Sequence, residues 1–228
     1  MSLWIFLLTL GLSLWATARV KAVYRRYSQL PVRSGITGAE AAMEILQRAG
    51  VSDVEIVAHD GFLGDHYDPI HRRLVLSHEN FYGRSAAALG VAAHEAGHAL
   101  QHAEAYKPLQ WRMAAVGIVT YANQVVTFLP LLFMVGGWLE PMVGLMLMAV
   151  AWGIIMAFNL ITLPVEFDAS RRARVVLHRM GFVTDEEAEG VDKVLRAAAW
   201  TYVAAFISSL LYFLYYVLPL LMGNRSRD

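Results

Sequence analysis

Three long stretches without a charged side chain dominate the pattern of hydrophobic and polar positions. They cover residues 113–139, 142–165 and 197–222. Each meets or exceeds the roughly 20 residues that a helix needs to cross the hydrocarbon core of a bilayer. Glu140-Pro141 separates the first two stretches, and a carboxylate followed by a helix-breaking proline is a natural loop between antiparallel spans. The pattern therefore predicts a transmembrane hairpin and a separate C-terminal span.

The N-terminal stretch is also apolar and reaches spanning length over residues 4–23, provided that Arg19 and Lys21 extend to the interface. Ala16-Thr17-Ala18 fits the cleavage site of a signal peptide as an alternative. The residues before the apolar core carry no basic side chain, whereas several basic residues follow it, and this charge bias favours a retained anchor. About four transmembrane helices are therefore expected.

Composition and charge agree with a membrane protein, since 57% of the residues are hydrophobic and 17% are charged. All but two of the 19 Lys and Arg residues fall in residues 19–112 and 171–196. The positive-inside rule then predicts that these segments, and any functional site they carry, are cytoplasmic in a bacterial-type cell membrane. Zero net charge gives no reason to expect nucleic acid. The absence of cysteine excludes disulfides and a cysteine nucleophile.

The first polar segment is long enough for a small domain. Thr37-Gly38-Ala39-Glu40 forms a capping box that opens a helix through about Ala49, and Gly50 ends it. Asp68-Pro69 marks a later turn. The same punctuation predicts two short strands and an alanine-rich helix over residues 54–58, 72–77 and 84–106.

The alanine-rich helix contains His94-Glu95-Ala96-Gly97-His98. Two histidines four residues apart project from one helix face with about 6 Å between their Cβ atoms, which suits two imidazoles on one metal ion. Glu95 is placed to approach a metal-bound water from the side. This is the HExxH pattern of metal-dependent hydrolases, in which the glutamate is the general base and the histidines bind zinc.

Three residues compete for the place of third metal ligand. His102 is about 12 Å along the helix axis from the first histidine, too far for both to share an ion. Glu104 stands where the elongated motif has its third histidine, but Gln101 occupies the glycine position of that motif. Glu166 follows the predicted hairpin, and two crossings return it to the membrane face of the histidines. The alternative for Glu166 is a helix N-terminal carboxylate after Pro164, a role compatible with metal binding.

Four segments of the chain resemble the membrane-associated family of neutral zinc metallopeptidases typified by YugP. The resemblance covers nearly the whole chain, through DHYDP at residues 65–69, GRSAAALGVAAHEAGHALQHAEAY at 83–106, TLPVEFDASRRA at 162–173 and LRAAAWTYVAA at 195–205. It implies His94, His98 and Glu166 as ligands of Zn²⁺ and Glu95 as the catalytic base.

More distantly, the sequence is similar to integral-membrane gluzincins that include prenyl-protein and heat-shock-induced proteases. In those proteins the ligand glutamate sits in an E-F/Y-x-A-D pattern whose aspartate orients a ligand histidine. Ser170 replaces that aspartate here. The candidates to supply the missing carboxylate are Asp168, Asp65 and Asp68.

These observations predict a mainly α membrane protein with about four transmembrane helices and a small α+β, zincin-like catalytic domain. The expected parts are an anchor with a basic flank, the zincin-like domain, the hairpin, cytoplasmic helices with the third ligand, and the last span with its tail. They cover residues 1–26, 27–111, 112–163, 164–196 and 197–228.

The expected function is zinc-dependent hydrolysis of peptide bonds in a peptide or protein substrate at the bilayer. Candidates for a donor to the oxyanion are His66, Tyr67 and Tyr202. The strand at residues 72–77 is expected at a sheet edge, where it either aligns substrate or is inert. Two alternatives remain: an intramembrane protease with the histidine helix in the bilayer, and a non-catalytic, zinc-stabilised membrane scaffold. The sequence does not indicate an oligomeric state.

Overall fold

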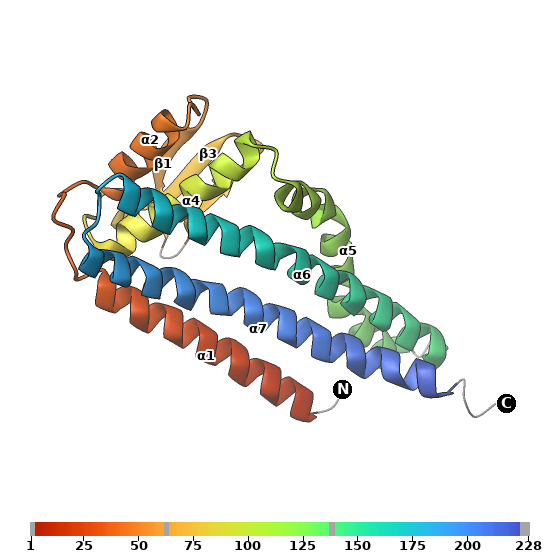
Figure 1. Cartoon of the computed structure of the whole chain (residues 1–228). Helices are drawn as coiled ribbons and strands as arrows, with labels where there is room; N and C mark the ends of the chain where they lie inside the picture. The colour runs from red at the N-terminus through yellow and green to blue at the C-terminus, as the bar shows by residue number, and fades with distance from the viewer. Residues whose placement is uncertain (1–2, 62–63, 137–139, 224–228) are drawn as a thin grey trace. The chain divides into compact units, whose positions relative to one another are not determined.

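The computed structural model describes residues 3–61, 64–136 and 140–223, and it is mainly helical (Figure 1). Within these residues the chain forms seven helices and three strands. The four long helices are α1 (Leu3–Tyr27), α5 (Lys107–Gly136), α6 (Pro141–Arg179) and α7 (Asp185–Gly223). The shorter elements are α2 (Gly38–Arg48), β1 (Glu55–His59), β2 (His66–Asp68), β3 (Arg73–Ser77), α3 (His78–Phe81) and α4 (Ala86–Ala103).

The four long helices are also the four that are long and apolar enough to cross a membrane. The candidate spans are Leu3–Tyr27, Lys107–Leu132, Pro141–Arg179 and Asp185–Met222. They agree in number and place with the four spans predicted from the sequence. Residues 137–139, part of the predicted hairpin loop, lie outside the described residues.

The prediction of a new helix after Pro164 is wrong, because α6 continues through this proline to Arg179. A proline inside a helix removes one backbone hydrogen bond. Ending the helix there would free several backbone polar groups beside an apolar segment, which costs more. Glu166 consequently lies in the interior of a long helix, and its interpretation as a helix N-terminal carboxylate is wrong as well.

The chain divides into two compact units. The described residues of Met1–Leu14, Trp111–Leu163 and Tyr202–Asp228 form the first unit, and those of Trp15–Gln110 and Pro164–Thr201 form the second. The first unit consists of apolar helical segments. The second contains the sheet, the short helices and the ends of the long helices.

The first unit is held by small residues and a few polar contacts between helices. Val119 and Ala122 of α5 pack with Ala151 and Ile155 of α6 in one buried cluster. The amide of Asn159 on α6 donates to the Ser209 hydroxyl of α7 at 3.0 Å. A hydrogen bond of this kind fixes how two apolar helices pack, because lipid offers the amide no alternative partner.

The sheet of the second unit has the strand order β1-β3-β2. β3 is parallel to β1, with Glu55 opposite Arg73, and antiparallel to β2, with His66 opposite Val75. The prediction that this strand lies at an edge is therefore wrong, because β3 is central. The reason is β2, whose three residues are too few to show an alternating pattern and were expected only as part of a turn.

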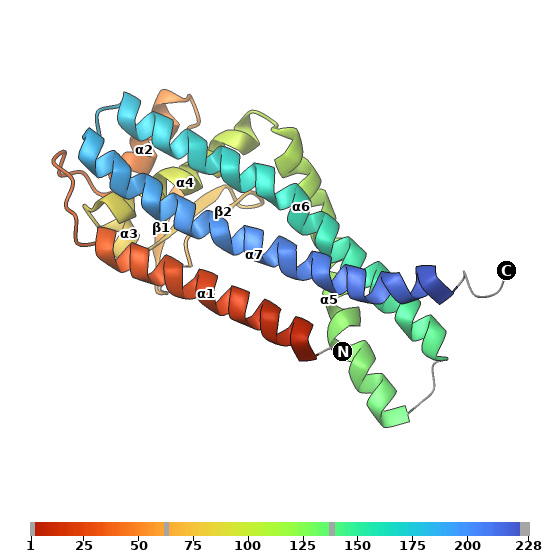
Figure 2. The same ribbon diagram turned by 60° about the horizontal axis from the view of Figure 1, so that its bottom comes forward.

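Helix α4 is central to the second unit, and most of its residues are buried. One apolar core joins it to α2, β3, α6 and α7, through residues such as Ile45, Leu74, Leu89, Leu177 and Val191. The second half of α1 lies beside the first half of α7 in both views (Figures 1 and 2), where Trp15 meets the edge of Trp200. Alanine suits α4 because a helix enclosed on every side has room only for small side chains.

Candidate metal centre

Local sequence signals explain why α4 forms where it does. Ser85 precedes the helix in an extended conformation, and its hydroxyl accepts the backbone N–H of Ala88 at 3.2 Å. Such an N-cap satisfies one of the free N–H groups of the first turn. Alanine then supplies the highest helix propensity over the following residues. The helix places His94 and His98 one turn apart, with ring centroids 4.8 Å apart.

A close approach between two helices brings the third side chain to these histidines. A Cβ atom on Gly97 would lie 2.9 Å from the backbone oxygen of Ala169 and 3.3 Å from its Cα. The backbones of α4 and α6 thus touch at a point where only glycine fits. Glu166 lies three residues before Ala169, about one helical turn, and so faces the pair of histidines.

The three side chains converge on one point. The Glu166 Oε2 atom lies 3.2 Å from His94 Nε2 and 3.6 Å from His98 Nε2. In the part of the chain that the structure describes, these residues form the cluster whose donor atoms could share a metal ion, all within 4.8 Å of one another. Tetrahedral zinc with bonds of about 2.0–2.1 Å separates its ligand atoms by about 3.3 Å. The two separations from Glu166 are therefore close to those the ion requires.

The other ring nitrogen of each histidine is held by a neighbouring side chain. His94 Nδ1 lies 3.2 Å from the Ser170 hydroxyl, and His98 Nδ1 lies 3.0 Å from the Gln101 Oε1 atom. The Gln101 amide nitrogen donates to the backbone oxygen of Val165 at 2.9 Å, so its Oε1 is the atom that faces His98. His98 Nδ1 must then carry the proton, which leaves the lone pair on Nε2.

The lone pair on His98 Nε2 makes this set of donor atoms suited to a cation. The lone pair of His98 Nε2 faces the carboxylate of Glu166, and two acceptors without a proton between them repel each other. Burial by itself lowers the pKa of His98, but the Glu166 carboxylate, with a smaller contribution from Glu95, raises it above its ordinary value. A site that attracts an extra proton in this way also attracts a metal ion. Two imidazoles and one carboxylate are a ligand set typical of catalytic zinc.

The similarity of this chain to known proteins extends over nearly its whole length. Residues 2–221 match the family model described as "Putative neutral zinc metallopeptidase". The chain belongs to this family. It is also 45% identical over 215 residues to the "Putative membrane protease YugP" of Bacillus subtilis (strain 168), a match that covers 94% of each protein. No solved structure matches the chain. The family resemblance drawn from the sequence motifs is thereby confirmed.

Two other candidates for the third ligand lie apart from the cluster, as helix geometry and the glutamine at the motif's glycine position predicted. His102 Nδ1 is 2.9 Å from the Tyr67 hydroxyl on β2. Glu104 is exposed and forms an ion pair with Arg172 at 2.8 Å. Neither side chain is part of the group of donor atoms around Glu166.

The three aspartates that were candidates for the missing carboxylate have different places. Asp65 accepts from the backbone N–H of Ser77 at 2.8 Å, and Asp68 accepts from that of Ile70 at 2.9 Å, so both organise the strand connections. Asp168 accepts from the Gln101 amide at 3.0 Å and thus reaches the histidines through another side chain. The contact expected from an aspartate at position 170 is made by Ser170 itself.

Gln101 is the site residue that sequence reasoning missed. It was considered only as a departure from the elongated motif, although it is fully buried beside His98. The available signal was an uncharged polar residue three positions after a ligand histidine, on the helix face that carries both histidines.

The candidates for oxyanion donors are spread over the chain. His66 Nδ1 is 2.8 Å from the backbone oxygen of Gly64, on the exposed edge of β2. Tyr67 on the same strand contacts α4 through His102. Tyr202 belongs to the other compact unit.

Proposed function

We propose that the protein is a membrane-embedded, zinc-dependent endopeptidase in which His94, His98 and Glu166 hold the metal ion and Glu95 is the general base. The observation that carries this proposal is the buried convergence of three donor atoms within 4.8 Å. Membership in the zinc metallopeptidase family supports the choice of zinc and of peptide-bond hydrolysis.

A zinc ion held by these residues would supply a Lewis acid and would lower the pKa of bound water toward neutrality. Glu95 is buried on α4 next to His94. Its carboxylate takes a proton from the attacking water and delivers it to the amine nitrogen as the C–N bond breaks. Burial raises the pKa of Tyr67, whose hydroxyl lies 2.9 Å from His102 Nδ1.

The position of α4 favours a site outside the hydrocarbon core. α4 is not among the helices of the described chain that are long and apolar enough to span a membrane. It packs against α2 and the sheet, in the compact unit that also contains the ends of the long helices. An intramembrane protease would need this helix in the bilayer, where its charged and imidazole side chains are costly. A non-catalytic scaffold has no use for a buried Glu95 beside the ligands.

The Glu95→Gln variant tests the catalytic part of the proposal. Glutamine keeps the size of the side chain but cannot accept the proton, so proteolysis of an unfolded protein should fall by at least about 100-fold. Metal analysis should still find about one zinc ion per chain, because Glu95 is not a ligand. Glu44→Gln, on the exposed surface of α2, is the matched control and should cleave like the wild type. Undiminished cleavage by Glu95→Gln would contradict the proposal.

The Glu166→Ala variant tests the ligand set. Removal of the carboxylate leaves two imidazoles, and zinc occupancy after gel filtration should fall well below that of the wild type. The same measurement on Glu140→Ala, at the residue that immediately precedes α6 and lies outside the cluster, should show full occupancy. Full occupancy in Glu166→Ala would remove Glu166 from the ligand set.

A further inference from the structure

Gln101 makes more contacts with the two ligand-bearing helices than the orientation of one histidine requires. It is 0% exposed, and both ends of its amide are hydrogen-bonded. Its Oε1 atom faces His98 Nδ1 at 3.0 Å on its own helix. Its Nε2 atom donates to the Val165 oxygen at 2.9 Å and to Asp168 Oδ2 at 3.0 Å, both on α6.

The two acceptors on α6 flank the third ligand. Val165 directly precedes Glu166, and Asp168 follows it by two residues. One amide therefore holds the ring of His98 and, at the same time, the segment of α6 that presents the Glu166 carboxylate.

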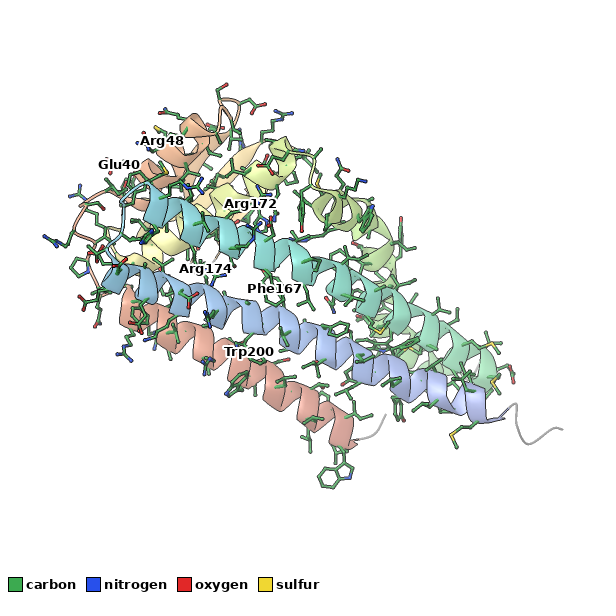
Figure 3. All side chains as sticks on the ribbon, viewed as in Figure 1. Glu40, Arg48, Phe167, Arg172, Arg174 and Trp200 are labelled. Carbon is green, nitrogen blue, oxygen red and sulfur yellow. The ribbon has the colours of Figure 1, made fainter. Side chains whose placement is uncertain are left out.

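A second set of contacts keeps this amide from turning over. A glutamine that flips its amide would place Nε2 against His98 and Oε1 against a carboxylate, where two acceptors repel each other. Asp168 is itself held by Arg172, whose guanidinium also pairs with Glu104 at 2.8 Å. Arg172 lies on α6 (Figure 3), and its guanidinium is 5.9 Å from the centre of the Tyr106 ring.

We propose that Gln101 is a positioning residue of the metal centre, which fixes the proton of His98 on Nδ1 and sets the register between α4 and Glu166, with Asp168 and Arg172 holding its amide in place. The inference rests on the zinc site proposed above. Residues that orient metal ligands in this way typically contribute about 10- to 100-fold to metal affinity.

The experiment measures the zinc dissociation constant of the full-length protein in detergent, with zinc alone as the probe and a chromophoric chelator as competitor. Gln101→Leu keeps the side-chain volume but cannot accept from His98, and it should bind zinc about 10- to 100-fold more weakly. Leu177→Ala is the control for a purely structural effect, because Leu177 is fully buried in the same core. It should lower the melting temperature and leave zinc affinity unchanged.

A pair of substitutions tests the direction of the hydrogen bonds. Gln101→Glu still offers an acceptor to His98. It also places a carboxylate at position 101 against the carboxylate of Asp168, and because the two repel each other, zinc binding should weaken. Adding Asp168→Asn restores a donor opposite that acceptor and should recover at least about tenfold of the lost affinity.

The outcomes separate this inference from the proposed function. A wild-type protein that binds zinc, with Gln101→Leu binding equally well, overturns the role of Gln101 and leaves the endopeptidase proposal standing. The role is also overturned when the double variant binds no better than Gln101→Glu alone. A wild-type protein that binds no zinc overturns both proposals. When Gln101→Leu does not fold, the comparison of the other two variants decides.

Discussion

The hydroxyl of Ser170 contacts a proposed ligand histidine, and in the distant relatives an aspartate carboxylate is expected to make this contact. Its Oγ atom lies 3.2 Å from His94 Nδ1, so a neutral partner fixes this ring. A neutral partner raises the basicity of the imidazole less than a carboxylate does. Three residues of the proposed site, His94, Glu95 and His98, could be named from the sequence because their spacing is tied to helix geometry and to a motif. Glu166 was named from the two predicted crossings and from the family resemblance. Gln101 and Ser170 could not be assigned, since their roles depend on which side chains another helix brings near.

The Ser170→Ala variant should weaken zinc binding by about two- to tenfold, the equivalent of one neutral hydrogen bond. Competition with a chelator measures this change. Ser209→Ala is the matched control, because Ser209 is a buried serine of the other compact unit and is hydrogen-bonded to Asn159. Equal zinc affinity in Ser170→Ala and the wild type would show that the hydroxyl does not support His94.

Among the helices and strands, those that begin at a recognisable capping or turn signal could be predicted. The capping box at Thr37 is formed as expected, with both hydrogen bonds present, and it opens α2. The strands β1 and β3 and the helix α4 lie within a few residues of their predicted bounds. β2 and α3 were not predicted, because three or four residues carry too little periodicity. The strand order depends on β2 and was consequently missed, as was the continuity of α6 through Pro164.

Gly97 is the position where the packing of two elements is expected to decide metal binding. In Gly97→Ala the new methyl group would lie 2.9 Å from the Ala169 oxygen, so α6 must move away from α4. The expected loss of stability is about 1–3 kcal/mol, together with weaker zinc binding as Glu166 retreats. Thermal unfolding and chelator competition measure the two effects.

Gly117→Ala on α5 is the matched control, since a Cβ there has nothing within 4 Å. Alanine has the higher helix propensity, so this variant should be as stable as the wild type or more stable. If Gly97→Ala behaves in the same way, the close approach of α4 and α6 is not what holds Glu166 in place.

For the whole molecule, the sequence predicted the class and the number of spans because both follow from length and composition alone. The proposed orientation rests on the distribution of basic residues, nearly all of which lie in residues 19–112 and 171–196. A reporter active only in the cytoplasm should be active when fused after Arg26 and inactive when fused to the C-terminus. A periplasmic signal from the fusion after Arg26 would reverse the proposed orientation.

Zinc should also stabilise the folded protein as a whole, because the three proposed ligands lie on two helices that are far apart in sequence. A metal that binds only the folded state at 100 times its dissociation constant adds about 2.7 kcal/mol to the free energy of unfolding. Chelation should lower the melting temperature of the wild type and leave that of Glu166→Ala nearly unchanged. Magnesium in place of zinc should not restore the wild-type value, since it prefers oxygen ligands.

The small side chains of α4 also determine which mutations the protein can tolerate. Almost every alanine and glycine on this helix is enclosed by neighbouring elements, and a larger residue has no space to enter. Bulky apolar residues elsewhere in the core can exchange with one another when their volumes are similar. In a complete survey of substitutions, the alanine and glycine residues of α4 should therefore be among the least replaceable residues of the chain.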